Sequence, residues 1–385
     1  MKLLLSNCAA IALLCLSTTT PARADVVLSA NDGHTVLNGK GGLVAAKEPK
    51  PDTVTIIDVK RYPPKIIGAV EAPHSVVGPP GAVWVAPDES WAIVTSATKA
   101  DPAGTDGISP DDRVSVIDLK ASPPKLVQST TAGTGATQVR VSPDGTLALI
   151  ANRAEGTVSI FTIKDKRLTP AGKLDTGNKA SLPSAVAFLK DGKTALLTRS
   201  GDNQISVLHI DGITVTIDPR PITAGLSPYT MDINSAGTLA AVANMGRGDG
   251  DNDTVALIDL SRSPFRTVEF ATVPSGPEPL KFSPDGKYLA VGSQESSTKP
   301  QSPFHQANGR VTLFAVQGKH LRPIAQSPIG PWAEGAAWSR DGKTLLLQNM
   351  GDQTISVFAV RFGHLIPGKP LKIETGGPES FGTAW

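Results

Sequence analysis

The chain has 385 residues, 19% of them charged, with 37 basic residues, 35 acidic residues and two cysteines. This balance excludes the clustered positive excess on which phosphate binding depends, so we expect no nucleic-acid partner. Both cysteines, Cys8 and Cys15, lie in a segment that we expect to be removed, so the mature protein should have neither a disulfide nor thiol chemistry.

Residues 1–24 have the pattern of a secretory signal peptide. Lys2 precedes an apolar run, and Ala22-Arg23-Ala24 is a small-x-small cleavage site. We predict cleavage after Ala24 and a periplasmic or secreted protein. No later segment offers about 18 uncharged apolar residues in a row, so no membrane span is expected. Residues 25–385 are predicted to form a single domain, and we expect a monomer.

Residues 137–163, TQVRVSPDGTLALIANRAEGTVSIFTI, contain the pattern that organises the chain. A strand leads into the turn Ser142-Pro143-Asp144-Gly145, and two more strands of alternating apolar residues follow. Proline presets the first φ of the turn, aspartate hydrogen-bonds its own backbone, and glycine accepts the positive φ that closes it. The segment therefore predicts three strands of a four-stranded antiparallel blade.

Related turns recur at residues 86–89, 189–192, 234–237, 283–286 and 339–342. A period of about 45–56 residues is typical of propellers and solenoids. The inner strands that lead into the six turns are predicted at 82–86, 138–142, 185–189, 229–233, 280–283 and 336–339. Third strands are predicted at 53–58, 113–118, 157–160, 204–207, 254–259, 310–313 and 354–357. The sequence thus predicts an all-β fold, a seven-bladed β-propeller.

The first blade is predicted to be composite. Residues 376–385 match the lead-in at 275–280 and should supply its inner strand, while residues 26–29, 53–59 and 65–70 supply the other three. Three N-terminal strands closed by the C-terminal strand would leave no free sheet edge there.

These repeats resemble YVTN-repeat and lactonase-like seven-bladed propellers, which are related in pattern to WD40-like repeats. The motif of a Ser-Pro-Asp-Gly turn, three apolar residues, Ala/Thr-Asn, a polar loop and Thr-Val-Ser-Val-Ile-Asp is met at 147–160 and 239–259, and more loosely at 344–357. Glu89 and Ser90 depart from it in one turn and Ala236 in another. Such families include lactone hydrolases, periplasmic binding or accessory proteins, and relatives of the amine dehydrogenase propeller subunit. A shared fold does not assign one of these activities.

Four of the loops between second and third strands are long, at 30–52, 97–112, 245–253 and 294–309, whereas 153–156 and 351–353 are short. These loops open on one face of a propeller, around the mouth of the central channel. The insertions predict a wall or a partner surface there, since loops on rigid scaffolds carry function. Neutral variation of surface loops is the alternative.

Arginines after the second strands are the predicted ligand-binding groups, because guanidinium binds carboxylate or phosphate with bidentate geometry. The alternative is local pairing with Glu155, Asp202 and Asp249. The full set of predicted ligand-binding residues is Arg153, Arg199, Arg247, Asn152, Asn244, Asn349, His74 and Trp332. Lead-in residues expected at the same mouth are His74, Lys179, Tyr229, Glu278, Trp332, Glu334 and Glu379.

Glu334 and Glu379, in adjacent blades, are the candidate catalytic pair. Such a carboxylate could act as a general base on water attacking a lactone carbonyl, with an arginine stabilising the oxyanion. Ordinary loop hydrogen bonding is the alternative.

Asp249, Asp251 and Asp253 alternate with small residues, which suits calcium. The EF-hand pattern is not met, because Leu260 occupies its twelfth position, and a solvated acidic loop is the alternative. Calcium is the one cofactor that the sequence suggests.

The leading hypothesis is therefore an exported binding or scaffold module that takes a small anionic ligand or a protein partner at its loop-rich face. A lactone hydrolase on the same ring is the first alternative. An accessory protein of a periplasmic quinone-linked oxidation system is a further alternative, implied only by the family resemblance.

Overall fold

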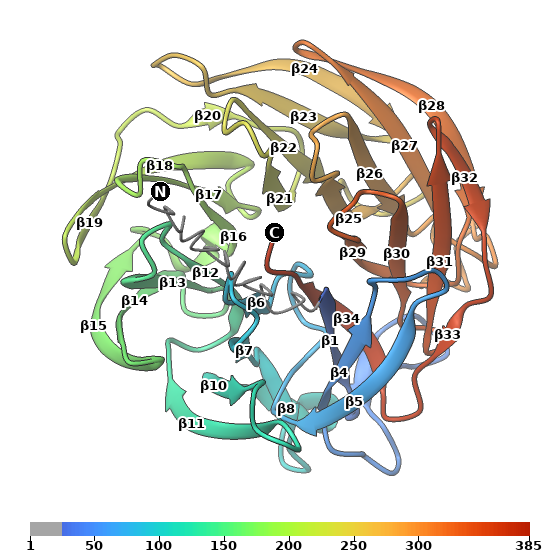
Figure 1. The fold of residues 1–385 in the computed structure, drawn as a ribbon, viewed down its shortest axis with the longest axis horizontal. Helices are drawn as coiled ribbons and strands as arrows, with labels where there is room; N and C mark the ends of the chain where they lie inside the picture. Colours follow the sequence, from blue (N-terminus) through green and yellow to red (C-terminus); the bar gives the residue numbers. More distant parts are fainter. Residues whose placement is uncertain (1–24) are drawn as a thin grey trace, which may run out of the picture.

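The computed structural model describes residues 25–385, so the predicted signal peptide lies outside the described residues. Seven antiparallel sheets of four main strands surround a central axis, as predicted (Figure 1). In blade 1 the sheet order is β34 (Gly377–Gly382), β1 (Val26–Asp32), β4 (Thr53–Asp58) and β5 (Lys65–Glu71). Blade 2 has β6 (Val83–Val85), β7 (Trp91–Thr95), β10 (Arg113–Asp118) and β11 (Lys125–Thr131).

The remaining blades follow in chain order. Blade 3 has β12 (Ala136–Val141), β13 (Leu147–Asn152), β14 (Thr157–Lys164) and β15 (Arg167–Asp175); blade 4 has β16 (Pro183–Phe188), β17 (Thr194–Arg199), β18 (Gln204–Asp211), β19 (Thr214–Ile217) and the short β20 (Ile222–Thr223). Blade 5 has β21 (Pro228–Ile233), β22 (Leu239–Asn244), β23 (Asp253–Asp259) and β24 (Arg266–Val273). Blade 6 has β25 (Pro277–Phe282), β26 (Tyr288–Ser293), β27 (Arg310–Gln317) and β28 (His320–Pro328); blade 7 has β29 (Ala333–Trp338), β30 (Thr344–Asn349), β31 (Thr354–Arg361), β32 (His364–Pro367) and the short β33 (Leu371–Lys372).

The turn between the first two strands of a blade is built by the predicted side chains. In blade 3, Asp144 accepts hydrogen bonds from the Ser142 hydroxyl and the Thr146 backbone N–H, and Gly145 has a φ of 75°. Blade 2 departs from this pattern, because Glu89 takes a positive φ of 54°. The Glu89 carboxylate instead receives a hydrogen bond of 2.9 Å from Arg340, so the departure ties blade 2 to blade 7.

In the first blade, β34 pairs antiparallel with β1, from Leu28 opposite Gly382 to Asp32 opposite Gly377. The Ser380 hydroxyl also accepts a hydrogen bond of 2.9 Å from the Ala82 backbone N–H at the start of blade 2. The C-terminal residue lies near the centre of the ring (Figure 1). Strands from both ends of the described chain therefore share one sheet.

The apolar core lies between neighbouring blades. One cluster joins Ile93 and Val116 of blade 2 to Val139 and Ile150 of blade 3, and all four side chains are fully buried. Burying a side chain of this size stabilises the fold by about 1.5–3 kcal/mol. Contacts of this kind repeat around the ring and fix the blades relative to one another.

The inner strands begin up to three residues earlier than predicted. The pairing of β25 with β26 shifts between Pro277 and Leu280, and that of β29 with β30 shifts between Ala333 and Ala336. Such a β-bulge places extra residues on one strand and re-aims their side chains. Pattern reading misses these starts because the apolar alternation resumes only after the bulge.

Blade 2 has an inner strand of only three residues, and the segment before it runs into the central channel. We call residues 74–82 the channel segment. Gly81 forms a parallel bridge with Gln138, and its carbonyl accepts a hydrogen bond of 3.0 Å from Arg140. His74 and Pro80 are buried. The channel is therefore filled in its middle by the protein's own chain.

The four long loops form one continuous layer over the loop-rich face, and two of them contain hairpins that the sequence analysis missed. These are β2 (Thr35–Leu37) with β3 (Leu43–Ala45), and β8 (Thr98–Ala100) with β9 (Ile108–Pro110) around the 3-10 turn η1 (Thr105–Gly107). A Cβ added to Gly107 would lie 2.8 Å from Ala45, and one added to Gly41 would lie 2.3 Å from the Thr298 carbonyl oxygen. Lys299 in turn donates a hydrogen bond of 3.0 Å to the Arg247 carbonyl.

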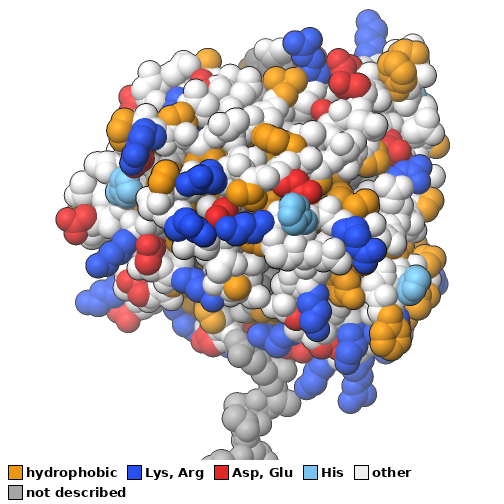
Figure 2. Space-filling model, turned by 90° about the horizontal axis from the view of Figure 1, so that it is seen from above, with side chains coloured by type: hydrophobic (Ala, Val, Ile, Leu, Met, Phe, Trp, Pro, Cys, Tyr) orange, Lys and Arg blue, Asp and Glu red, His pale blue; other side chains and the backbone are white. Residues whose placement is uncertain are grey.

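Within residues 25–385 no helix is long and apolar enough to cross a membrane. On the side of the molecule shown in Figure 2, basic and acidic side chains are interspersed. This distribution agrees with the near-equal numbers of the two charges in the sequence.

Candidate functional site

The inner-strand bulges bring three glutamates from adjacent blades into the channel. Glu278, Glu334 and Glu379, which we call the carboxylate cluster, are only 3%, 1% and 1% exposed. Tyr229 occupies the same repeat position in blade 5 and is also buried. The lead-in residues thus come together as expected, except that Lys179 is exposed in the short turn η2 (Lys179–Ser181).

Each glutamate of the cluster has a different partner. His74 Nε2 lies 2.8 Å from Glu379 Oε2, and Gln294 donates a hydrogen bond to Glu278. Glu334 lies close enough to the Trp332 side chain and to Glu278 for both to influence its pKa. The cluster therefore contains a histidine–carboxylate ion pair beside two electrostatically coupled carboxyl groups.

Burial and mutual repulsion raise the pKa of these carboxyl groups. Burial, followed by the charge of Glu379, raises the pKa of Glu278 to about 8. The pKa of Glu334 lies well above its usual value for the same reason, with Glu278 as the nearest charge. Two adjacent buried carboxyl groups cannot both ionise cheaply, so the pair of Glu278 and Glu334 retains at least one proton at neutral pH.

His74 and Glu379 differ from Glu278 and Glu334 because they form an ion pair with each other. Burial lowers the pKa of His74, but the hydrogen bond and charge of Glu379 outweigh it, so the pKa is raised above 6.5. Burial raises the pKa of Glu379, and His74 opposes that shift. Strongly perturbed groups of this kind are typical of functional sites, although buried structural networks show them as well.

The three predicted arginines do not form one anion site. Arg153 stacks over the Tyr229 ring at 5.2 Å and donates a hydrogen bond of 2.7 Å to the Ser200 hydroxyl. Arg199 pairs with Asp202, as the local alternative predicts. The side chain of Arg247 is exposed. Glu155, which was the predicted local partner of Arg153, instead pairs with Lys173 at 2.7 Å.

The predicted asparagines brace the ends of the second strands. Asn152 accepts a hydrogen bond of 3.1 Å from the Gly133 N–H, and Asn244 accepts one of 3.1 Å from the Gly225 N–H. Asn349 donates to the Thr354 hydroxyl at 2.9 Å. Asn152 and Asn244 therefore hold their blades to the incoming loops, whereas Asn349 is tied to its own third strand and its buried amide oxygen has no hydrogen-bond partner among the described residues.

The predicted calcium residues are spread apart. Asp249 and Asp251 are exposed, whereas Asp253 is buried and accepts a hydrogen bond of 2.8 Å from the Gly276 N–H. Burial raises the pKa of Asp253 to about 6. The group in the described chain that does bring three possible ligand atoms within 4.8 Å of one another is a different one, Asp32, His34 and Asp52.

This second group acts as an ion-pair staple. His34 Nδ1 lies 2.8 Å from Asp52 and 3.1 Å from Asp32. The Asp32 carboxylate also accepts from the Val76 N–H, and Asp52 accepts from the His74 N–H. Burial lowers the pKa of His34, but the hydrogen bond to Asp52 and the charges of Asp32 and Asp52 together outweigh it and raise the pKa. Carboxylates already occupied by N–H donors suit an imidazolium better than a metal ion.

A cavity of about 310 Å³ lies at the loop-rich mouth of the channel, and we call it the mouth cavity. Its lining includes Val36 and Leu37 of β2, Lys50, Trp332 and Met350. Trp332 has an unusual positive φ of 57° and is 7% exposed. Because the same side chain lies close enough to Glu334 to lower its pKa, Trp332 links the mouth cavity to the carboxylate cluster.

Sequence reasoning placed Glu334, Glu379 and Trp332 at the mouth but assigned no role to Asp32, His34, Asp52 or Lys50. It also placed Glu278 at the mouth but gave it no catalytic role, although Glu278 occupies the repeat position of Glu334. The staple residues had no such signal, because they lie at the two ends of a long loop whose path the sequence does not reveal.

Comparison with known proteins supports the architecture. A family model described as "Lactonase, 7-bladed beta-propeller" matches residues 115–217. No curated protein matches the chain.

Similar solved structures share the fold at low identity. A putative 6-phosphogluconolactonase from Bacteroides fragilis is 17% identical, with a TM-score of 0.70 over 95% of this chain and 98% of that one. The periplasmic gluconolactonase of Pseudomonas aeruginosa is 17% identical, with a TM-score of 0.68 over 92% and 98%. A putative 6-phosphogluconolactonase from Bacteroides uniformis is 15% identical, with a TM-score of 0.70 over 93% and 99%. The predicted resemblance to lactonase-like seven-bladed propellers is thus confirmed.

Proposed function

We propose that this propeller is an exported binding module that takes a small anionic ligand at the loop-rich mouth of its channel. The mouth cavity is the observation that carries the proposal. Its apolar lining from Val36, Leu37 and Met350 suits the body of a ligand, and Lys50 supplies a positive charge. Largely apolar cavities with a few polar groups are typical of small-molecule sites.

The hydrogen bonding of Lys50 supports an anionic ligand. Its ammonium group donates a hydrogen bond of 3.2 Å to the Glu374 carbonyl, which is uncharged. Two acidic residues also line the mouth cavity: Asp32 has its oxygens occupied by backbone N–H groups, and Glu48 is exposed to solvent.

The test is calorimetric titration of the chain starting at Asp25 with hexanoate, which has an apolar body and one carboxylate. Lys50→Gln should weaken binding about tenfold, since a hydrogen bond to a charged group contributes roughly 1.5–3 kcal/mol. Lys65→Gln, at an exposed position on β5, is the matched control and should bind normally. No heat of binding in the unmodified chain, or equal losses in both variants, would contradict the proposal.

A lactone hydrolase is the second candidate, favoured by the bridge that Trp332 makes between the mouth cavity and Glu334. A displaced Trp332 would admit a lactone to a carboxyl group whose raised pKa suits proton transfer near neutral pH. Aldono- and acyl-lactones should then be hydrolysed, and Glu334→Gln or Glu379→Gln should abolish turnover. Assays with and without EDTA would show whether Asp249, Asp251 and Asp253 bind a required metal. Absence of turnover on every lactone would rule out these substrates.

A further inference from the structure

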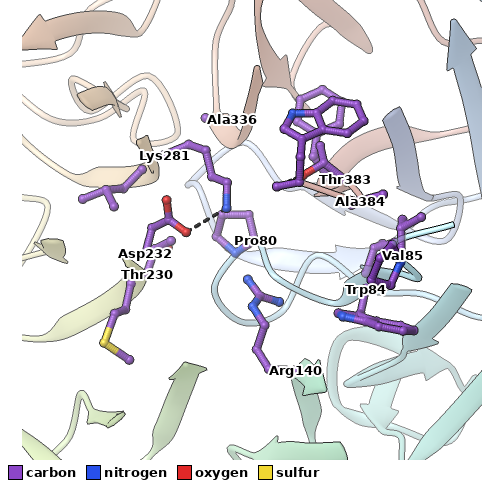
Figure 3. Close-up of a pocket in the computed structure, with 17 residues that line it drawn as sticks. Pro80, Trp84, Val85, Arg140, Thr230, Asp232, Lys281, Ala336, Thr383 and Ala384 are labelled. Carbon is purple, nitrogen blue, oxygen red and sulfur yellow. Dashed lines mark hydrogen bonds and ion pairs between the residues drawn. The ribbon is translucent and has the colours of Figure 1, made fainter. Parts of the chain in front are cut away.

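A second recess lies on the other side of the channel segment, in the half of the channel that faces the Ser-Pro-Asp-Gly turns. We call it the turn-side pocket. It has a volume of about 270 Å³ and is lined by residues that include Pro80, Trp84, Arg140, Asp232, Lys281 and Trp385. In Figure 3 the side chains of Arg140 and Lys281 both point toward Pro80.

The charged residues of this pocket occupy one repeat position. Arg140, Asp232 and Lys281 each stand two residues before the first residue of a turn, on inner strands β12, β21 and β25. Trp84 holds the same position on β6. The equivalent residue in blade 4 is Ala187, and Ala336 of blade 7 also lines the pocket. Small residues on some blades and long ones on others leave an asymmetric hollow.

Of the charged groups in this pocket, Arg140 is the one outside the Lys281–Asp232 ion pair, although the charge of Asp232 still acts on it. Asp232 is engaged by Lys281 Nζ at 2.7 Å and by the Phe282 N–H at 2.9 Å. Arg140 Nη1 donates to the Val139 and Gly81 carbonyls, which are uncharged. The three charges therefore leave a net positive charge at the guanidinium, in a recess where water screens it less than at the surface.

Two tryptophans give the pocket rigid flat walls. Trp84 packs edge-on against Trp91 with ring centroids 4.9 Å apart. Trp385 donates a hydrogen bond of 3.0 Å to the Trp338 carbonyl, and the Arg340 guanidinium lies 4.5 Å from its ring centroid. Rings held in this way can pack against a flat ligand with little loss of side-chain entropy.

We propose that the turn-side pocket binds a small organic carboxylate with a single flat ring. The guanidinium of Arg140 binds the carboxylate, and Trp84 and Trp385 contact the ring. The volume of about 270 Å³ limits the ligand to roughly one ring with short substituents. This site is independent of the proposed function, because Lys50 and Trp332 do not line it.

The test uses benzoate as the probe and two readouts, calorimetry and tryptophan fluorescence of the full mature chain. Benzoate should bind and change the fluorescence of the pocket tryptophans. Arg140→Gln should lower the affinity about tenfold or more. The matched control is Arg220→Gln, at a side chain that is 75% exposed, which should bind benzoate as the unmodified chain does.

A second variant keeps the test decisive if Arg140→Gln unfolds the chain. Ala336→Leu fills the pocket without changing a charge and should prevent benzoate binding while hexanoate still binds at the mouth cavity. Failure of benzoate to bind at millimolar concentration would overturn the proposal, as would unchanged affinity in a folded Arg140→Gln or Ala336→Leu variant. Binding of inorganic phosphate as tightly as benzoate would overturn the assignment to ring carboxylates.

Discussion

The two halves of the channel use the same inner strands in opposite ways. Toward the loop-rich face, the bulge residues Glu278, Glu334 and Glu379 are sealed by the loop layer and keep protons. Toward the turn face, residues after the bulges, such as Arg140 and Lys281, line an open pocket. The channel segment lies between the two halves and contributes His74 to one and Pro80 to the other.

This difference shows how one repeat supports two environments. A bulge re-aims the residues on one side of it, while the regular alternation continues on the other side. The sealed half must neutralise its charges internally, through the His74–Glu379 pair and shared protons. In the open half Arg140 donates to the Val139 and Gly81 carbonyls, and the charge of Asp232 acts on it without forming an ion pair.

The largest expected effect comes from breaking the buried pair of the sealed half. Glu379→Ala leaves the protonated His74 without its carboxylate, and removing one partner of a buried ion pair costs about 3–5 kcal/mol of unfolding free energy. Urea denaturation measures this loss. Glu374→Ala, at an exposed glutamate of the same segment, should change stability by no more than about 0.5 kcal/mol. Equal effects of the two variants would show that the pair is not charged.

The protons held in the sealed half of the channel should make the stability of the protein depend on pH. Because the pKa of Glu278 is about 8 in the folded state and 4.5 otherwise, the folded chain binds the extra proton. Unfolding free energy should therefore fall as pH rises from 4.5 to 8, by up to about 1.4 kcal/mol per pH unit for one proton. Glu278→Gln should flatten this slope, whereas Glu374→Gln should not. A slope unchanged by Glu278→Gln would place its pKa near the usual value.

The loop layer that seals one half can be tested with a pair of glycines. Gly41 has a φ of 82° and lies against the Thr298 carbonyl, whereas Gly212 has a φ of 58° with nothing within 4 Å of an added Cβ. Both alanine variants should cost about 1 kcal/mol for the left-handed backbone. Gly41→Ala should cost a further 1–2 kcal/mol, roughly, because a backbone atom must move. Thermal unfolding compares the two, and equal losses would mean that the loops do not press together there.

The smallest effect is expected for the ion pair of the open half. Lys281→Met removes the partner of Asp232, whose side chain is 13% exposed and still receives the Phe282 N–H. We expect a loss of about 1 kcal/mol, because water can reach the carboxylate. Urea denaturation should therefore separate this variant clearly from Glu379→Ala. A loss as large as 3 kcal/mol, roughly the cost of breaking a buried pair, would show that this half is also sealed.

Much of the fold was predictable because it depends on short-range sequence patterns. The turn at Ser142-Pro143-Asp144-Gly145 and its copies fix where strands reverse, and the period of these turns gives seven blades. Glu334 and Glu379 could be placed at the channel for the same reason, since they occupy equivalent positions in adjacent repeats. The starts of β25 and β29 could not, because a bulge breaks the alternation on which strand prediction depends.

The sequence by itself therefore determined the repeat, the blade count and some residues that face the channel, such as Glu334 and Glu379. Only the tertiary structure decided which others join them and how they are used. Arg153 reaches the Ser200 hydroxyl instead of Glu155, and Asp32, His34 and Asp52 meet across the two ends of a long loop. Contacts between blades and between loops depend on three-dimensional packing, whereas turns and strand alternation depend on neighbouring residues, and only the latter can be read along the chain.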